Sequence, residues 1–227
     1  MEVLNERDNL PEVLDLIPKG YEVVVVNDGS SDGSGELARE LGALVIDHPI
    51  NLGQGIAFVS GIKGAMMAGA DIIVHIDGDG QHDPRQIPQF VDYLNERPKI
   101  DVVVGSRRIG SNEEYPLLRK LFLPVFNGII RWITGYKVSD YLCGFRAYRV
   151  SSLKRVMHIF DEYYNAQYNA TEMFIGFSSE GLRIAEIPVD VKPRKSGNSY
   201  KGNIKYGVNI LIAIYLSLNR WNRGKKR

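Results

Sequence analysis

This 227-residue chain is organised around the stretch Asp71-Ile72-Ile73-Val74-His75-Ile76-Asp77-Gly78-Asp79-Gly80-Gln81-His82-Asp83-Pro84. The apolar first half predicts a buried strand, and the carboxylates of Asp77 and Asp79 follow at its mouth. Two such carboxylates repel each other and lose hydration, so the arrangement is costly unless a cation neutralises it. Oxygen ligands suit Mg²⁺ or Mn²⁺. The pattern therefore predicts a cation site at the end of this strand.

The alternative for the same turn is a solvated loop that leads into a helix. Asp83 would then cap the helix and Pro84 would take its first position, and this cap is expected in either case. His82 is interpreted as a polar residue of the turn, with a ligand contact as its alternative role.

Strand and helix patterns alternate along the chain. Val23 to Val26 belong to a continuous β-branched run, which is typical of a strand covered on both faces. Strands are expected at 21–26, 43–46, 71–76 and 100–105, and helices at 35–41, 55–68 and around 87–94. This order predicts an α/β fold with a mostly parallel, doubly wound sheet, in which ligands lie beyond the carboxyl ends of the strands. Asp28, Asp77 and Asp79 all fall at such ends.

Composition and length fit one globular domain. Apolar residues make up 44% of the chain and charged residues 24%, so disorder is not expected over most of it. Cys143 is the single cysteine, which excludes an intramolecular disulfide, and its apolar neighbours predict a buried, inert thiol. Residues 1–8 lack the pattern of a signal peptide, so a cytoplasmic location is expected.

The net charge of +1 hides a strong asymmetry. Residues 192–227 carry ten Lys or Arg and no Asp or Glu, whereas residues 1–191 carry 18 basic and 27 acidic side chains, a net charge of −9. The expected C-terminal helix at 200–227 is interrupted by polar residues, so it is interpreted as lying at a membrane interface or docking on its own domain. Nucleic-acid binding is not favoured, because the basic residues are not interleaved with several aromatics.

Six motifs follow one another with regular intervals: residues 5–11, 26–33, 51–55, 77–84, 105–107 and 140–146. Together they resemble the family 2 inverting glycosyltransferases of GT-A fold, and most closely the dolichol-phosphate mannose synthase branch. The resemblance covers nearly the whole chain, with 1–199 as the GT-A domain. It implies transfer of a hexose from a nucleotide sugar, GDP-mannose or a UDP-sugar, to a polyprenyl (dolichyl) phosphate.

The resemblance also assigns roles to the acidic motifs. Asp77, Asp79 and Gln81 are expected to gather Mg²⁺ or Mn²⁺ and the donor diphosphate, with Asp79 catalytic, and Asp77 lies beside the donor. Asp28 is expected to bind the nucleoside, and a cap of its own turn is compatible with that role. Glu6, at the end of the family's first strand, is expected to contact the donor's base.

Three arginines are expected near phosphate groups. Arg107 and Arg146 resemble family residues that hold the donor and acceptor phosphates and are assigned as catalytic, with structural salt bridges as the alternative. Arg194 lies with Ser196 and Ser199 in a loop that resembles one closing over the donor, with a flexible basic linker as its alternative. Because a phosphate acceptor is largely deprotonated at neutral pH, no strong general base is expected.

Two further regions carry open alternatives. Glu172 matches a frequent family acid, with a helix-surface or supporting role as the alternative. Residues 115–132 are apolar but punctuated by basic residues; they resemble helices that face a membrane, and a core helix pair is the alternative. The expected location is peripheral, on the cytoplasmic face of a membrane.

The first strand departs from the family pattern. The family begins with a complete apolar strand ending in Pro-x-Tyr-Asn-Glu, and here only Val3-Leu4-Asn5-Glu6 corresponds to it. A shortened strand is expected to leave an apolar slot open and to weaken donor binding.

The remaining alternatives for the function are a non-catalytic nucleotide-sugar-binding relative and a nucleotidyltransferase, although the Gly-rich basic signature of the latter is absent from the sequence.

Overall fold

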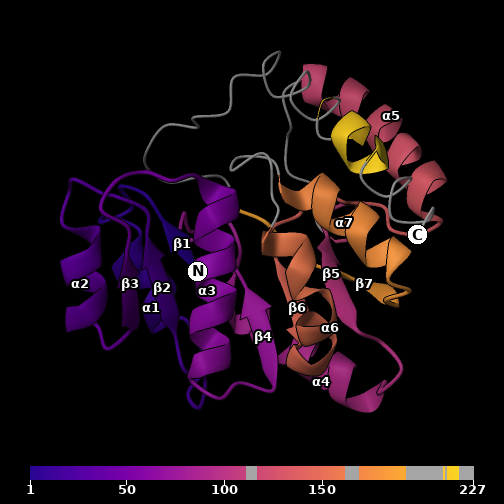
Figure 1. Cartoon of the computed structure of the whole chain (residues 1–227). Helices are drawn as coiled ribbons and strands as arrows, with labels where there is room; N and C mark the ends of the chain where they lie inside the picture. The colour runs from indigo at the N-terminus through magenta and orange to yellow at the C-terminus, as the bar shows by residue number, and fades with distance from the viewer. Residues whose placement is uncertain (111–116, 162–168, 193–211, 213, 220–227) are drawn as a thin grey trace.

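A computed structural model of the chain describes residues 1–110, 117–161, 169–192, 212 and 214–219 (Figure 1). The strands are β1 (Glu2–Val3), β2 (Val24–Asn27), β3 (Leu44–Asp47), β4 (Ile72–His75), β5 (Val102–Ser106), β6 (Arg146–Arg149) and β7 (Ile184–Pro188). The helices are α1 (Leu10–Asp15), α2 (Ser34–Glu40), α3 (Gln54–Met67), α4 (Ile87–Glu96), α5 (Leu117–Thr134), α6 (Val150–Asp161) and α7 (Asn169–Ser179), with the 3₁₀ turn η1 (Pro84–Gln86) before α4. The four strands and three helices expected between residues 21 and 105 are confirmed, with ends that differ by a few residues.

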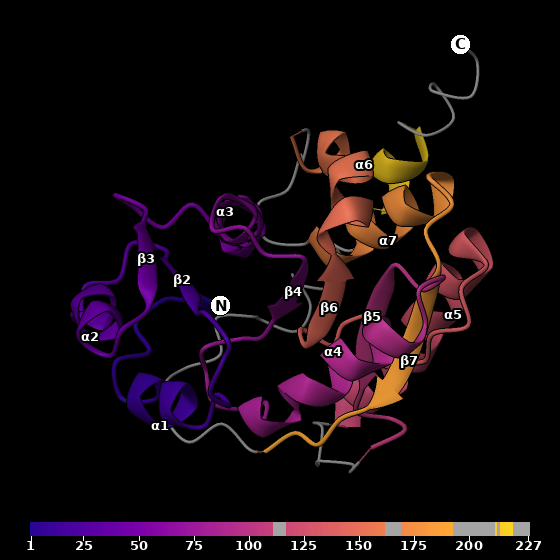
Figure 2. The same ribbon diagram turned by 90° about the horizontal axis from the view of Figure 1, so that it is seen from below.

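The strands form two groups that meet near the amino terminus. One group has the order β1-β2-β3 and is parallel; the other has the order β4-β6-β5-β7. They adjoin at β1 and the end of β4, where the amide of Gly78 donates to the carbonyl oxygen of Glu2 at 3.3 Å. Figure 2 shows α1 and α4 on one side of the strands and α3, α6 and α7 on the other. The expected α/β fold with a mostly parallel sheet is confirmed.

Strand β6 runs against its neighbours. It pairs antiparallel with both β4 and β5, whereas β5 and β7 are parallel. The chain reaches β6 at the carboxyl edge of the sheet, where β4 and β5 end, so its first residue, Arg146, lies opposite His75 and Val104. This reversal brings the start of β6 to the edge where parallel strands place ligands.

The core is continuous in the second group of strands. Val102, Val103 and Val104 of β5 are completely buried, as expected for a strand covered on both faces. Phe90 and Phe145 stack with ring centroids 4.3 Å apart and join α4 to the segment before β6. A smaller cluster around Val3, Leu10, Val25 and Ala38 supports the first group.

Two local expectations are confirmed. Cys143 is fully buried, and burial raises the pKa of its thiol to about 12, so the thiol is neutral and inert. The side chain of Asp83 accepts from the amide of Arg85 at 3.0 Å and caps η1, with Pro84 in the first turn.

An apolar cavity lies between β2 and β4. It has a volume of about 310 Å³ and is lined by residues that include Val24, Phe58, Ile73 and Ile87. Strand β2 pairs with β3 along all four of its residues, but β1 meets it only at two positions. Within the described residues, the cavity therefore occupies the place where a longer β1 would run. Weaker donor binding as a consequence stays a prediction.

Helix α5 and the residues near the carboxyl end each pack on the domain with one face. In α5, which is one helix and not a pair, Ile130 is buried while Val125 and Trp132 are 62% and 85% exposed. Near the carboxyl end, Ile214 belongs to the core, which supports the docked interpretation, and Tyr215 is exposed. The boundary at 199/200 and the basic residues from 220 onward lie outside the described residues. Among the helices of the described part, none combines the length and apolarity needed to cross a membrane.

Four apolar, β-branched residues added before Met1 are expected to continue β1 along β2 and fill the cavity. Filling a cavity regains lost contacts but costs the entropy of ordering four residues, so we expect a net gain of about 2 kcal/mol in the free energy of unfolding. Urea denaturation measures it. A Gly-Ser extension of equal length is the control, and equal stability of the two extended proteins would contradict the assignment of the cavity to strand pairing.

Candidate active site

Five of the predicted site residues come together at one edge of the sheet. Asp28 follows β2, Asp77 and Asp79 follow β4, and Arg107 follows β5. Arg146 reaches the same edge because β6 is antiparallel and begins there. These five residues thus place three carboxylates and two guanidinium groups at the carboxyl edge of the strands.

Asp28 holds the loop after β3 against the end of β2. It is 4% exposed, and its carboxylate accepts from the amides of Leu52 and Gly53, both at 2.9 Å, and lies 2.7 Å from Nδ1 of His48. Gly29 follows with φ +75°, and a Cβ there would lie 2.4 Å from the backbone of the same loop. The Asp-Gly pair therefore joins two of the sequence motifs, 26–33 and 51–55, into one structure.

Asp77 lies at the meeting point of several segments. The side chain of Gln54, at the start of α3, donates to its Oδ1 at 3.4 Å. A Cβ on Gly144 would lie 2.4 Å from Oδ2 of Asp77, so the segment before β6 passes directly against this carboxylate and a side chain at 144 would displace it. Asp77 is partly buried, which leaves its carboxylate within reach of a ligand.

Asp79 orders its own turn. Its Oδ1 accepts from the amide of Gln81 at 3.1 Å, and Gly80 takes φ +73° within that turn. The carbonyl oxygen of Gln81 in turn accepts from the amide of Lys192 at 2.7 Å. The chain just before Arg194 is therefore bound to the Asp79 turn. Arg194, with Ser196 and Ser199, lies outside the described residues.

Arg107 forms a buried, bidentate ion pair with Asp140. Its Nε lies 2.6 Å from Oδ2 and its Nη2 lies 2.7 Å from Oδ1. Burial alone raises the pKa of Asp140, but the bonds from Arg107 outweigh it and the net pKa is lowered. The salt-bridge alternative for Arg107 is thus present, and it links the motif after β5 to the motif before β6.

Arg146 has a different environment. It is 4% exposed, its Nη2 donates to the carbonyl oxygen of Tyr141 at 3.0 Å, and its guanidinium lies 5.2 Å from the ring centre of Phe174. Its Nε is buried and has no hydrogen-bond partner among the described residues. Because a buried donor without a partner is costly, this nitrogen is suited to a ligand oxygen.

Three other residues differ from or refine the sequence interpretation. Glu6 is buried and accepts from the side chain of Asn9 at 2.6 Å. The helix-surface alternative for Glu172 is wrong, because it is only 5% exposed within α7. His82 is not a solvated turn residue: it is 5% exposed, packs against Phe145, and burial lowers its pKa to about 4.

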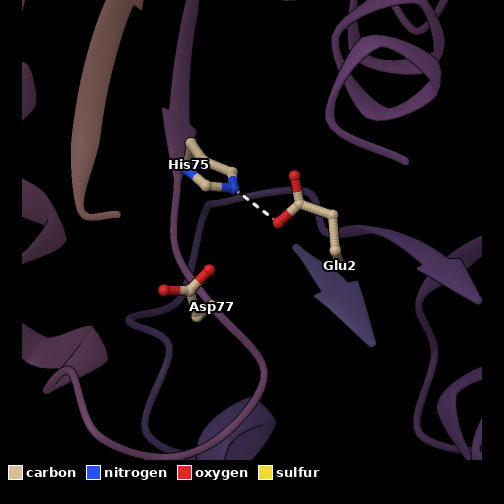
Figure 3. A group of neighbouring side chains, drawn as sticks. All are labelled: Glu2, His75 and Asp77. Atoms are coloured by element: carbon tan, nitrogen blue, oxygen red, sulfur yellow. Dashed lines mark hydrogen bonds and ion pairs between the residues drawn. The ribbon is translucent and has the colours of Figure 1, made fainter. Parts of the chain in front are cut away.

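Sequence reasoning missed a contact between β1 and β4. Nε2 of His75 lies 2.5 Å from Oε2 of Glu2, and Nδ1 of His75 lies 2.6 Å from the carbonyl oxygen of Gly144. The carboxylate of Asp77 converges on the same point (Figure 3). The only sequence signal for this contact was His75, a single histidine in an otherwise apolar strand. Its partner, Glu2, lies 73 residues away.

Comparison with known proteins places the chain among glycosyltransferases. The model of Glycosyl transferase family 2 matches residues 1–157. An undecaprenyl-phosphate mannosyltransferase of Micrococcus luteus is 29% identical over 96% of this chain and 90% of its own length. An undecaprenyl-phosphate 4-deoxy-4-formamido-L-arabinose transferase of Edwardsiella ictaluri is 34% identical over 95% of this chain, which spans 64% of that longer protein.

Solved structures agree on the fold. Glucosyl-3-phosphoglycerate synthase of Mycobacterium tuberculosis, in complex with Mn²⁺ and UDP-glucose, superposes with a TM-score of 0.70 at 22% identity over 95% of this chain and 76% of that one. The fold is GT-A, as the six motifs predicted. With residues 1–157 matched by the family model and the carboxylates and arginines gathered at the carboxyl edge of its sheet, the chain belongs to glycosyl transferase family 2 and is a glycosyltransferase.

Proposed function

We propose that this glycosyltransferase moves a hexose from a nucleotide sugar, GDP-mannose or a UDP-sugar, to a polyprenyl (dolichyl-type) phosphate, with inversion and with Mg²⁺ or Mn²⁺. The observation that carries the proposal is the gathering of Asp77, Asp79 and Arg146 at one sheet edge in a chain of this family. The two relatives named above differ in sugar but share an undecaprenyl-phosphate acceptor, so the acceptor class has the stronger support.

The residues at the Asp77–Gln81 turn suit a hard cation. Asp77, Asp79 and Gln81 offer only oxygen atoms, which are the ligands that Mg²⁺ and Mn²⁺ prefer. A cation held there would neutralise charge on the departing diphosphate. The solved relative carries Mn²⁺ with UDP-glucose, which supports the cation but does not select between the two metals.

The nucleoside of the donor is proposed to bind at the end of β2, beside Asp28. The carboxylate of Asp28 already accepts two amide bonds and contacts His48, so its proposed contribution is mainly to shape the pocket with the loop at 48–53. Glu6 lies beside Asn9 at the end of the short first strand, where the donor's base is expected. Arg194 is proposed to contact the donor diphosphate.

The proposed reaction is a single displacement. An oxygen of the acceptor phosphate attacks the anomeric carbon and forms the new C–O bond, while the bond to the diphosphate breaks and the leaving group takes its electron pair. Arg146 has a buried Nε suited to a phosphate oxygen and would hold the acceptor in line. Two N–H groups of the Arg107 guanidinium already donate to Asp140, so the proposed role of Arg107 is to position the segment that carries Arg146.

Helix α5 is the proposed membrane contact. Val125, Gly128 and Trp132 are exposed and recur at helical spacing on one face, while Ile130 on another face is buried. A Trp at the edge of an apolar face suits the headgroup region of a bilayer, where a lipid acceptor would enter. The proposed location is therefore peripheral, on the cytoplasmic face of a membrane.

Family membership favours glycosyl transfer over nucleotidyl transfer, the alternative considered from the sequence. A non-catalytic nucleotide-sugar-binding relative is the outcome to be separated by experiment. Incubation of the protein with a panel of GDP- and UDP-sugars, Mn²⁺ or Mg²⁺ and polyprenyl phosphate, followed by mass spectrometry of the lipid, tests this directly. Absence of any glycosyl lipid with every donor would overturn the proposal.

Replacing Asp79 by Asn is expected to lower kcat by at least about 100-fold, because a carboxylate that serves the leaving diphosphate is lost. The matched control is Asp71→Asn, which removes an exposed carboxylate at the opposite end of β4. Both variants should keep the melting temperature of the wild type. Equal activity of the Asp79 variant and the control would remove Asp79 from the catalytic site.

The two arginine motifs are expected to respond differently. Asp140→Asn leaves the buried Arg107 without its partner charge and should lower the free energy of unfolding by about 3 kcal/mol. Arg146→Lys keeps the charge but loses the planar fork, so we expect a KM for polyprenyl phosphate raised about tenfold at nearly constant stability. Urea denaturation and acceptor titration measure the two effects, and a stability loss in Arg146→Lys equal to that in Asp140→Asn would argue against the phosphate role.

Trp132→Ser is expected to weaken partitioning onto vesicles that contain phosphatidylglycerol about fivefold, because the side chain that anchors α5 is lost. Met67→Ser is the control, since Met67 is 89% exposed on α3, away from the proposed face. Cosedimentation with vesicles gives the partition coefficient. Identical partitioning of the two variants would place the membrane contact elsewhere.

A further inference from the structure

A cluster of three possible metal ligands lies at the junction of the two strand groups. Glu2 comes from β1, His75 from β4 and Asp77 from the turn that follows β4, and one ligand atom of each lies within 4.8 Å of the others (Figure 3). We propose that these residues bind a divalent transition-metal ion such as Mn²⁺ or Zn²⁺ without any nucleotide. This site is separate from the oxygen-only set of the proposed donor site and shares only Asp77 with it.

The histidine is oriented as a metal ligand. Its Nδ1 lies 2.6 Å from the carbonyl oxygen of Gly144, which can only accept, so Nδ1 is the donor of this hydrogen bond. This leaves Nε2 as the ligand atom on the side of Glu2 and Asp77. A backbone carbonyl on the second nitrogen is the usual way in which a metal-bound histidine is held in position.

The burial of Glu2 is a second observation in favour of a metal site, independent of the spacing of the three ligand atoms. Its side chain is 10% exposed, Oε2 lies 2.5 Å from Nε2 of His75, and Oε1 is buried with no hydrogen-bond partner among the described residues. A buried carboxylate oxygen without a partner is costly, and a cation removes that cost. An ion bound to both Oε2 of Glu2 and Nε2 of His75 would replace their direct contact at 2.5 Å.

The required movement is small. Ligand atoms about 2.1 Å from an ion lie about 3 to 3.5 Å apart, so Glu2 and His75 need to separate by about 1 Å while Asp77 approaches. Glu2 and His75 also line the cavity of about 310 Å³ between β2 and β4, which gives their side chains room to adjust. A metal ion bound by residues of β1 and β4 would cross-link the two strand groups at their junction. It would also fix the position of Asp77.

The ligand types separate this site from the donor site. The Asp77, Asp79 and Gln81 set offers oxygen only and is expected to fill with a nucleotide sugar present. The Glu2, His75 and Asp77 set includes a nitrogen, which suits Mn²⁺ or Zn²⁺ better than Mg²⁺. Binding of the metal alone, and nitrogen coordination, are therefore the two distinguishing properties.

The experiment titrates the full chain with Mn²⁺ in the absence of nucleotide and follows free Mn²⁺ by electron paramagnetic resonance. We expect one Mn²⁺ per chain, with the Kd raised at least tenfold in Glu2→Gln and in His75→Gln. Asp79→Asn is the matched control and should change the Kd less than twofold. Wild-type protein that binds no Mn²⁺, or His75→Gln that binds as tightly as wild type, would overturn the proposal.

A second measurement needs no variant and so does not depend on how each substitution affects folding. Pulsed electron paramagnetic resonance of Mn²⁺ bound to the wild-type protein should detect coupling to a ¹⁴N nucleus of imidazole. Coupling to oxygen ligands alone would assign the ion to the Asp77–Gln81 turn and refute the site at Glu2 and His75. Because neither measurement involves a sugar donor, failure here leaves the proposed transfer reaction to its own assay.

Discussion

The contact between Glu2 and His75 is the constraint on which the arrangement of the active edge depends. Strands β1 and β4 belong to separate hydrogen-bonded groups, and the cavity beside them shows that no long ladder joins these groups within the described residues. The buried pair of side chains and the amide bond from Gly78 to Glu2 hold the junction instead. A buried pair of this kind is costly to break, because removal of one partner leaves the other without compensation. The relative positions of Asp28, on one side of the junction, and Asp77, on the other, therefore follow from it.

The two arginines at the active edge illustrate how one residue type serves two purposes. Arg107 is bound at both ends of its fork by Asp140, which fixes the segment from 140 to 146 beside β5. Arg146, at the end of that segment, keeps a buried Nε that has no partner among the described residues. The ion pair orders the segment, and the ordered segment presents the second guanidinium. Under the proposed function, replacement of either arginine is expected to lower activity through a different physical effect: lost folding energy for Arg107 and a lost contact with the proposed acceptor for Arg146.

The alternating strand and helix patterns and the order of the six motifs were sufficient to predict the fold and the edge of the sheet where the candidate site residues gather. Runs such as Val24–Val26 and turns such as Asp77–Gln81 are local signals. The antiparallel direction of β6 was not predicted, since it depends on how a long intervening segment returns to the sheet. A salt bridge of Arg107 was one of the two alternatives, but its partner Asp140 was not predicted, and the contact between Glu2 and His75 was missed. These pairs join residues 33 and 73 positions apart. His82 was misread for a related reason: its polar neighbours suggest a solvated turn, but it pairs with the chain at Val191 and its ring packs against Phe145.

Asp77 connects these separate features. Its carboxylate contacts Gln54 from α3, lies against Gly144 from the segment that Asp140 anchors, and faces His75 and Glu2 at the junction. Each of these neighbours comes from a different part of the chain, so the position of this one carboxylate reports on the assembly of both strand groups and of β6. Gly144 tolerates no side chain without movement of Asp77, since a methyl group there would lie 2.4 Å from Oδ2 of Asp77 and would force the carboxylate to rotate. A residue without a side chain thus constrains the position of Asp77 in the proposed cation site.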